Sequence, residues 1–359
     1  MASIAKRPDG QWRARYRDAA GKEHSRHFSR KVDAQGWLDR VTAAVVSGAY
    51  VDPKLAKTTV EAWCERWVEG YGTRRPSTVR SAKVHLAQIK AEFGSLPLAA
   101  VRPSLVKSWT AKLKAEGKST SYIYAPHSRL AQVMADAVHD GLLARNPCSR
   151  RTSPGAGSQR AYVATTDQVW ALHDAMPKHL RVAVLLGAFV GLRTAEACGL
   201  RVVDVDFMRG IVSPTVQWPG EPLKTEISRS AVPIPNELAL ELSAAVKQCP
   251  AATVVSDGVG GVASPWAIER AIRTARAKVK GLPPGFRFHD LRHYFASLLI
   301  SSGADVKVVQ ARVRHASAKT TLDTYGHLWP DSDESARAAV GVVLAARADS
   351  LRTNEVASG

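Results

Sequence analysis

Apolar residues recur at helical spacing along most of this chain. Between residues 58 and 147 the pattern predicts four amphipathic helices, beginning near Val60, Pro76, Pro103 and Ser119. Four helices with short connections are expected to pack as a small bundle. Beyond residue 162 the helical pattern returns, and it predicts helices over 235–247, 265–279, 289–302 and 305–312. We therefore expect a mostly α protein with small β elements, of the α+β class.

Strand periodicity is confined to two intervals. Near the N-terminus, arginines alternate with Trp12, Ala14 and Tyr16. This alternation predicts a two-stranded hairpin that turns at Ala20-Gly21 and has one basic face, followed by a helix through Val41. In the second interval, short strands are expected at 211–212, 216–218 and 231–234, with Leu223-Lys224-Thr225 at the turn of the last pair.

Breaks in these patterns divide the chain into domains. Asp52-Pro53-Lys54 interrupts the first helical pattern, and residues 149–161 are rich in Ser, Gly, Pro and Arg, which is typical of a linker. The last predicted element is an amphipathic helix over 332–346. The expected division is an N-terminal sheet-and-helix domain 1–55, a helical bundle 56–148, a linker 149–161, a mainly helical domain with a small sheet 162–345, and a disordered tail 346–359.

Composition adds a strong positive charge to this picture. The 359 residues carry 50 Lys plus Arg against 32 Asp plus Glu, a net charge of +18 (50 − 32), and the pI is near 10.0. Unless the composition is merely alkaline or ribosome-like, a chain this basic is expected to bind a polyanion, first of all nucleic acid. A hydrophobic share of 45% supports a folded core and excludes wholesale disorder.

Several other classes are disfavoured by the sequence. The longest apolar stretch, 182–192, is about half of the roughly 20 residues that a membrane-spanning helix needs. The start, MASIAKRPDG, has no apolar signal-peptide core. The cysteines have no C-x-x-C spacing, which indicates neither a zinc module nor a disulfide framework, and they are expected to be reduced thiols: Cys64, Cys148, Cys198 and Cys249.

The residues with the most chemical information lie in the last domain. Arg193 begins a helix behind an apolar one, and Lys224 lies in the second β interval. His289 and Arg292 are three residues apart, so a helix presents both on one face. Each of these has an ordinary explanation by itself, such as surface charge or chance spacing. Their order along the chain, continued by His315 and Tyr325, is the informative feature.

These segments together resemble the tyrosine recombinase family, and within it the phage-type or mobile-element integrases. The resemblance covers essentially the whole chain and is strongest between residues 187 and 328. GAFVGLRTAE resembles the family's first arginine box, and EPLKTEISRSAVPIP its β-hairpin lysine box. FHDLRHYFAS resembles the His-x-x-Arg box, and TTLDTYGHL the nucleophile box.

The resemblance implies an enzyme that cuts and rejoins DNA at attachment sites. Arg193 and Arg292 would hold the non-bridging oxygens of one phosphate, a task that suits the bidentate, permanently charged guanidinium. Tyr325 would attack phosphorus and form a 3′-phosphotyrosyl link, which leaves a free 5′-hydroxyl. Because that link conserves the bond energy and the cations stabilise the charge, neither a metal nor ATP is expected as a cofactor.

The remaining site residues take supporting roles in the same resemblance. His289 would be the general base, Lys224 the general acid for the leaving oxygen, and His315 a hydrogen-bond donor to the phosphate. Glu196 would orient a neighbouring catalytic group. One position departs from the family, where a glycine usually precedes the third-box histidine: Arg314 stands there. It is expected either to add a phosphate contact or to shift the local turn.

The resemblance also interprets the other domains. Residues 1–55 look like an arm-type DNA-binding domain whose sheet enters the major groove. Its basic face is made of Arg13, Arg15 and Arg17, although a hairpin whose arginines simply face water would show the same pattern. Residues 56–148 look like a core-binding domain. Helix starts there carry candidate phosphate contacts, although ordinary capping also explains the hydroxyls: Arg74, Arg75, Ser77, Thr78, Lys118 and Ser119.

The partners implied are core and arm attachment sites on double-stranded DNA, gripped by a C-shaped clamp. A homo-tetramer on DNA is expected. The C-terminal helix is expected to dock on a neighbouring subunit, and the alternative is that it packs on its own subunit. An excision factor and a host DNA-bending protein are further expected partners, and the location is the cytoplasm of a bacterial host, at the nucleoid. The alternatives are a host-type chromosome- or plasmid-resolving recombinase, a type IB topoisomerase, and a DNA-binding protein without catalysis.

Overall fold

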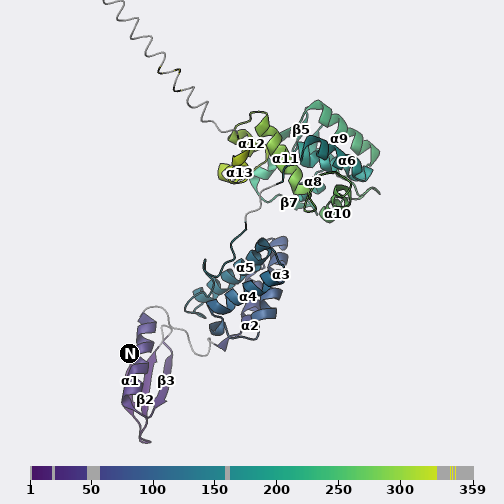
Figure 1. Cartoon of the computed structure of the whole chain (residues 1–359). Coiled ribbons are helices and arrows are strands. Elements are labelled where there is room, and N and C mark those ends of the chain that lie inside the picture. Colours follow the sequence, from purple (N-terminus) through teal and green to yellow (C-terminus); the bar gives the residue numbers. More distant parts are fainter. Residues whose placement is uncertain are drawn as a thin grey trace, which may run out of the picture. The chain divides into compact units, whose positions relative to one another are not determined.

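The computed structural model describes most of the chain (Figure 1). The described residues are 2–17, 21–46, 57–157 and 162–329, with Val340, Val342 and Leu344. The chain forms two compact units, Met1–Gln159 and Arg160–Gly359, whose boundary falls inside the predicted linker. The separation of residues 1–55 from 56–148 stays a prediction. Outside the described residues lie Ala20 of the predicted turn, the break at 52–54, the tail 346–359 and all but three residues of the helix 332–346.

The N-terminal part is an antiparallel three-stranded sheet covered by one helix. Its elements, in chain order, are β1 (Ser3–Lys6), β2 (Trp12–Arg17), β3 (Glu23–Phe28) and α1 (Lys31–Val46). The hairpin β2–β3 was predicted, whereas the edge strand β1 was missed because four residues are too short to show alternation. Ala14 and Tyr16 are buried, and the Tyr16 ring lies 5.6 Å from that of Trp37 on α1.

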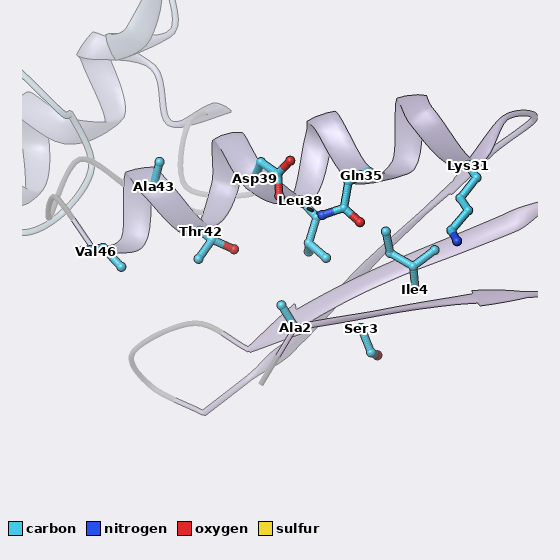
Figure 2. A pocket seen from close by; sticks show the side chains of 10 residues that line it. All are labelled: Ala2, Ser3, Ile4, Lys31, Gln35, Leu38, Asp39, Thr42, Ala43 and Val46. Carbon is cyan, nitrogen blue, oxygen red and sulfur yellow. Dashed lines mark hydrogen bonds between the residues drawn. The ribbon is translucent and has the colours of Figure 1, made fainter.

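The helix packs on the sheet through a narrow set of apolar side chains. Figure 2 shows the groove between β1 and α1, which Ile4 lines from the strand and Leu38 and Thr42 line from the helix.

The arginines of β2 share the sheet face that carries Glu23. Alternation along β2 therefore separates a packed face from a charged one, as the sequence predicts.

Residues 57–157 contain the predicted helices α2 (Val60–Tyr71), α3 (Pro76–Phe93), α4 (Pro103–Ala115) and α5 (Thr120–His139). Proline opens α3 and α4, where its missing N–H costs no helical hydrogen bond. The indole nitrogens of Trp63 and Trp67 donate to the Val133 carbonyl at 2.9 Å and to Asp136 at 2.6 Å. Both bonds join α2 to α5 inside the bundle.

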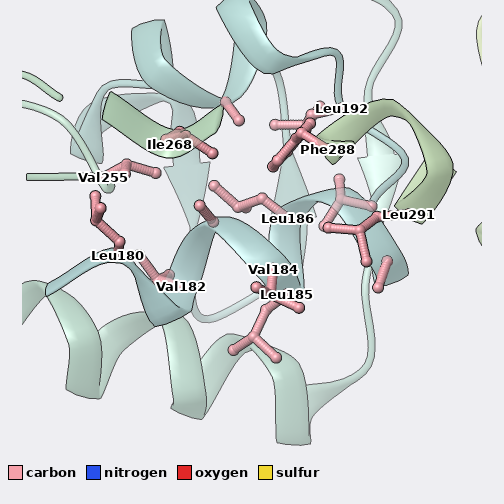
Figure 3. Close-up of a cluster of buried hydrophobic side chains, with 14 of the residues drawn as sticks. Leu180, Val182, Val184, Leu185, Leu186, Leu192, Val255, Ile268, Phe288 and Leu291 are labelled. Carbon is pink, nitrogen blue, oxygen red and sulfur yellow. The ribbon is translucent and has the colours of Figure 1, made fainter. Parts of the chain in front are cut away.

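The second unit is built around α7 (Arg181–Phe189), which is apolar on all sides and almost wholly buried (Figure 3). Against it packs α11 (Phe288–Ser301), and Leu291 comes so close that a Cβ on Gly187 would lie 3.0 Å from it. The other helices are α6 (Thr166–Ala175), α8 (Thr194–Gly199), α9 (Asn236–Gln248), α10 (Pro265–Arg276), α12 (Val306–Arg312) and α13 (Ala318–Tyr325).

The β interval of this unit differs from its prediction. β4 (Val205–Asp206), β5 (Ile211–Val212) and β8 (Val232–Pro233) form one sheet, and β6 (Val216–Gln217) pairs with β7 (Glu221–Pro222). The predicted turn at 223–225 is wrong. The chain turns earlier, at Pro219-Gly220, where glycine adopts a φ of 111°. Lys224 therefore follows the hairpin.

Two expectations from composition can be compared with the structure. Among the described residues, no helix is both long and apolar enough to cross a membrane. All four cysteines are free thiols, and three of them are buried.

Candidate active site

Four segments of the second unit bring most of the predicted site residues together. Arg193 precedes α8, Arg292 lies on α11, His315 follows α12, and Tyr325 ends α13. The loop between α7 and α8 passes very close to α11, because a Cβ on Gly191 would lie 2.5 Å from the Phe295 ring. Gly191 also has a φ of 68°, so glycine is required there for two reasons.

Arg193 is held by a buried carboxylate. Glu196 is 3% exposed, its Oε1 accepts from Arg193 Nη1 at 2.7 Å, and its Oε2 accepts from the Arg193 backbone N–H at 2.9 Å. Burial alone would raise the pKa of Glu196, but the charges of Arg314 and Arg193 outweigh burial and lower it. Glu196 is therefore an anion that fixes the direction of the Arg193 side chain, the geometry that an orienting role requires.

Arg292 is the most deeply placed cation of the predicted set, at 1% exposure. It donates to the carbonyl oxygens of Gly191 and Val313, which ties the α7–α8 loop and the end of α12 to α11. Burial and the nearby charges of Arg193 and Arg314 lower the pKa of Arg292. Arginine nevertheless keeps its proton in proteins.

The charge of this cluster is unbalanced. The three guanidinium groups of Arg193, Arg292 and Arg314 are associated with one carboxylate, Glu196, which leaves +2 (3 − 1). Burying unpaired positive charge is unfavourable, and a bound anion would relieve it. The site is therefore electrostatically suited to a phosphate group.

Tyr325 is 1% exposed, and its hydroxyl is hydrogen-bonded to His293 rather than to His289. The distance from Tyr325 Oη to His293 Nδ1 is 2.8 Å. Burial raises the pKa of Tyr325 to about 12, although the charge of Arg292 opposes that shift. The phenol is thus firmly protonated in this state.

The three histidines near Tyr325 have different contacts. The His315 ring stacks parallel to Tyr325 at 6.1 Å, and its Nδ1 lies 3.0 Å from Thr321 Oγ1. Burial, together with the charges of Arg292 and Arg193, lowers the pKa of His315 to about 4. The His289 ring meets that of His293 edge to face at 4.8 Å, and burial and the same arginines lower its pKa.

Lys224 is exposed and lies beyond β7, on the segment that leads into the 3₁₀ helix Glu226–Arg229. That segment is anchored to the cluster by Ser228, whose hydroxyl accepts from Arg193 Nη1 at 3.3 Å. Leu223, which is 3% exposed, anchors its other side. The segment is thus held on both sides of Lys224, which is itself exposed.

Arg314 does not offer the phosphate contact that the sequence suggested. Its side chain is 0% exposed, and it donates to Glu196 Oε2 at 2.7 Å and to the Ser228 carbonyl at 3.1 Å. Its φ is 52°, the left-handed conformation that a glycine would adopt without strain. The turn geometry is thus that of a glycine, while the side chain takes an inward, structural position.

The candidate DNA-contacting residues lie on the first unit, in separate groups. Arg13, Arg15 and Arg17 share a sheet face with Glu23, which lies 3.4 to 3.9 Å from each guanidinium. Among the helix starts, Ser119 caps α5 by accepting from the Tyr122 N–H at 3.2 Å, so ordinary capping does explain this hydroxyl.

The bundle carries two groups of candidate phosphate contacts, one at the start of α3 and one before α5, and they do not lie together. Lys118, of the second group, lies over the ring of Tyr122, whose hydroxyl is hydrogen-bonded to Gln88 on α3 at 2.8 Å. At a rise of 1.5 Å per residue, Gln88 lies about 18 Å along the helix axis from the first residue of α3. The group at that start is exposed or half-buried: Arg74, Arg75, Ser77 and Thr78.

Sequence reasoning missed His293, Ser228 and Thr321 as members of the site. His293 had a signal, because it lies four residues after His289 and therefore on the same helix face. Ser228 and Thr321 lie inside the segments that resemble the lysine and nucleophile boxes, but a single serine or threonine there gives no sign that it contacts Arg193 or His315. Within the described ranges, no group of three or more His, Cys, Asp or Glu side chains is arranged to hold a metal ion.

Comparison with family models matches two parts of this chain. Residues 163–331 match the model described as "Phage integrase family", and residues 2–47 match "Phage integrase, N-terminal domain".

Similar proteins of known sequence extend over most of the chain. The putative prophage phiRv2 integrase of Mycobacterium tuberculosis is 27% identical over 339 residues, covering 87% of this chain and 88% of that protein. The integrase of Mycobacterium phage D29 is 26% identical and covers 83% and 84%. Tyrosine recombinase XerC of a Methylobacterium species is 30% identical over 249 residues, covering 67% and 71%.

Solved structures share the fold at low sequence identity. The Tn1549 transposon integrase in complex with transposon right end DNA has a TM-score of 0.69 at 19% identity, covering 80% of this chain and 100% of that chain. A lambda integrase tetramer bound to a Holliday junction has a TM-score of 0.61 at 20% identity, covering 92% and 95%.

Proposed function

Because this chain belongs to the phage integrase family of tyrosine recombinases, whose members cut and rejoin DNA strands, we propose that it is a site-specific integrase. It acts at attachment sites on double-stranded DNA, where it inserts and excises a phage genome or another mobile element. The observation that carries this proposal is the cationic cluster, in which Arg193 and Arg292 lie with Tyr325 and have one carboxylate, Glu196, for three guanidinium groups.

The chemistry follows from what each residue can do at a phosphodiester. Arg193 and Arg292 hold the non-bridging oxygens and stabilise the charge that develops at phosphorus. Tyr325 attacks phosphorus and becomes linked to the 3′ end of the cut strand. Lys224, on its exposed segment, protonates the departing 5′-oxygen, and His315 donates to the phosphate. The fixed cations supply the charge stabilisation that would otherwise be asked of a metal, so we propose no metal and no ATP.

The rest of the chain supplies DNA recognition in this proposal. The basic face of β2 binds arm sites in the major groove, and the exposed helix starts of the bundle bind the phosphates of core sites. Four copies assemble on DNA, and the C-terminal helix docks on a neighbour. The lambda integrase tetramer on a Holliday junction, which has this fold, supports this proposal. An excision factor and a host DNA-bending protein are proposed partners, at the bacterial nucleoid.

The direct test is to recover the covalent intermediate. Duplexes from a random-sequence library are first selected by binding to the full chain. A nick is then placed so that the fragment with the free 5′ end diffuses away after cleavage and cannot be rejoined. We expect DNA attached to protein through a 3′-phosphate, a free 5′-hydroxyl on the other product, and a modified peptide that contains Tyr325. Selected duplexes that bind tightly but never form this adduct, at any nick position, would contradict the proposal.

A host-type resolving recombinase is the second candidate, and the similarity to XerC favours it. The match of residues 2–47 to a phage N-terminal domain model favours the integrase. Deleting residues 1–54 separates the two candidates. For an integrase we expect integration between two plasmids, each carrying a library-selected segment of arm and core sites, to fall below detection while adducts on core duplexes persist. Unchanged integration by the deletion variant would favour the host-type enzyme.

A further inference from the structure

The unassigned group closest to the chemistry is His293, on the face of α11 that looks toward α13. Its Nδ1 lies 2.8 Å from Tyr325 Oη, and its ring lies 5.6 Å from the Tyr325 ring. Resting on the proposed function, we propose that His293 accepts the Tyr325 proton when the phenol attacks the DNA phosphate. His293 would then be a catalytic residue, and His289, to which the family resemblance gives that role, would not be the acceptor.

Geometry separates His293 from the other two histidines. Among the described residues, Tyr325 Oη has its hydrogen bond with His293. His315 Nδ1 is engaged with Thr321 at 3.0 Å, and the His315 ring lies parallel to the tyrosine ring instead of in line with its hydroxyl. His289 contacts His293 edge to face. A general base must be within hydrogen-bond reach of the proton it removes, and His293 meets that condition.

Proton transfer, bond formation and bond cleavage are coupled at Tyr325 in the proposed step. The Oη–H bond of Tyr325 breaks, and its proton moves to Nδ1 of neutral His293, which carries its own proton on Nε2. The phenolate oxygen bonds to phosphorus, the bond from phosphorus to the 5′-oxygen breaks, and Lys224 protonates that oxygen. In the rejoining step the 5′-hydroxyl gives its proton to Lys224 and its oxygen bonds to phosphorus, the bond from phosphorus to Tyr325 breaks, and His293 returns its proton to the tyrosine, so the cycle consumes nothing.

The electrostatics make this transfer depend on bound DNA. His293 faces His289 and Arg292 on its own helix, His315 from the loop after α12, and Tyr325 from α13. Burial lowers the pKa of His293 to about 4, and His289, the charge of Arg292 and His315 add to that shift, while burial raises the pKa of Tyr325 to about 12. Transfer is therefore strongly uphill without substrate. An anionic phosphate held by Arg193 and Arg292 offsets their charge and raises the basicity of His293.

Single-turnover cleavage of the selected, nicked duplex tests this role. His293→Gln keeps a hydrogen-bond acceptor for the tyrosine but cannot take up a proton. At pH 7 we expect it to cleave about 100-fold or more slowly than the wild type. Its rate should rise about tenfold per pH unit as solvent deprotonates the phenol, whereas the wild-type rate depends less on pH. His289→Gln is the matched control, and we expect a smaller loss with a wild-type pH profile.

The leaving group identifies which proton transfer is damaged. A duplex with sulfur in place of the 5′-bridging oxygen needs no acid, so we expect it to restore Lys224→Ala but not His293→Gln. A more acidic fluorinated tyrosine at position 325 should restore cleavage by His293→Gln but not by Lys224→Ala.

Two measurements verify that His293→Gln is folded: its noncovalent binding of the same duplex and its unfolding temperature. If His293→Gln does not fold, His293→Asn replaces it. A further measurement uses the fluorinated tyrosine in the otherwise wild-type chain, where we expect the cleavage rate to depend less on pH.

The outcomes that overturn this role differ from those that overturn the proposed function. A His293→Gln rate within about threefold of the wild type, or restoration by the sulfur leaving group, would exclude His293 as the acceptor while the wild type still forms adducts. Loss in His289→Gln alone would return the role to His289. Absence of adducts in the wild type would instead remove the proposed function.

Discussion

Replacement of Tyr325 by phenylalanine is expected to abolish the covalent protein–DNA adduct and to leave noncovalent DNA binding intact. The change removes only the hydroxyl oxygen, which is the nucleophile of the proposed reaction. The ring stays packed in the small apolar cluster that includes Phe295, Ile300 and Val309. The lost hydrogen bond to His293 costs about 1 kcal/mol, so the fold is expected to persist.

The measurement is adduct formation on the nicked duplex, resolved on a denaturing gel, beside the affinity for the intact duplex. Tyr294→Phe is the matched control, because Tyr294 is also buried on the same unit, at 5% exposure, and its hydroxyl lies 3.1 Å from Thr166 Oγ1. We expect that variant to form adducts at the wild-type level. Adducts that persist in Tyr325→Phe would show that another residue is the nucleophile.

The helices could be predicted because each carries its own signal. Prolines at the first positions of α3 and α4 and the apolar periodicity of α2 are local features, and they are found where the sequence places them. The two-residue strands of the second unit carry no periodicity, so their pairing follows from tertiary contacts. That is why Lys224 was assigned to a turn that the chain makes four or five residues earlier, at Pro219-Gly220.

The site illustrates the same limit with single side chains. The ordered arginines, histidines and tyrosine identified the chemistry, and the structure gathers most of them. The partner of Tyr325, however, is 32 residues away in sequence, and that of Arg314 is 118 residues away. No local pattern tells whether an arginine beside a predicted site histidine turns toward DNA or into the protein. Here the direction is set by the buried carboxylate of Glu196.

The Glu196 carboxylate is also expected to contribute strongly to the free energy of unfolding. Glu196 and Arg314 are 3% and 0% exposed, and removing one partner of a buried ion pair leaves the other charge unpaired, at a cost of about 3–5 kcal/mol. Glu196→Gln has nearly the same shape but presents an amide N–H₂ where a carboxylate oxygen faced a guanidinium. We expect the second unit to lose that amount and its unfolding temperature to fall by roughly 10 °C.

The matched control is Glu226→Gln, because the Glu226–Arg229 pair has the same three-residue spacing as Glu196 and Arg193 but is exposed. Exposed pairs contribute about 0–1 kcal/mol, so that variant should unfold almost as the wild type does. Thermal and urea unfolding of the full chain supply both values, and the DNA-cleavage rate supplies a second readout. We expect cleavage to fall in Glu196→Gln and not in Glu226→Gln, since only Glu196 holds Arg193.

Combining Glu196→Gln with Arg314→Gly tests whether the buried charge causes the loss. Glycine accepts the φ of 52° at this position without strain and removes the guanidinium that the first change left unpaired. The double variant should therefore be more stable than the sum of the two single losses predicts, by about 1 kcal/mol or more. Two results would contradict the idea that Glu196 links Arg193 to Arg314 through a buried ion pair. One is strict additivity of the two losses in unfolding free energy, and the other is a loss below about 1 kcal/mol in Glu196→Gln. A favourable coupling would explain how this chain tolerates arginine where the resembled family has glycine, because Glu196 anchors both Arg193 and Arg314.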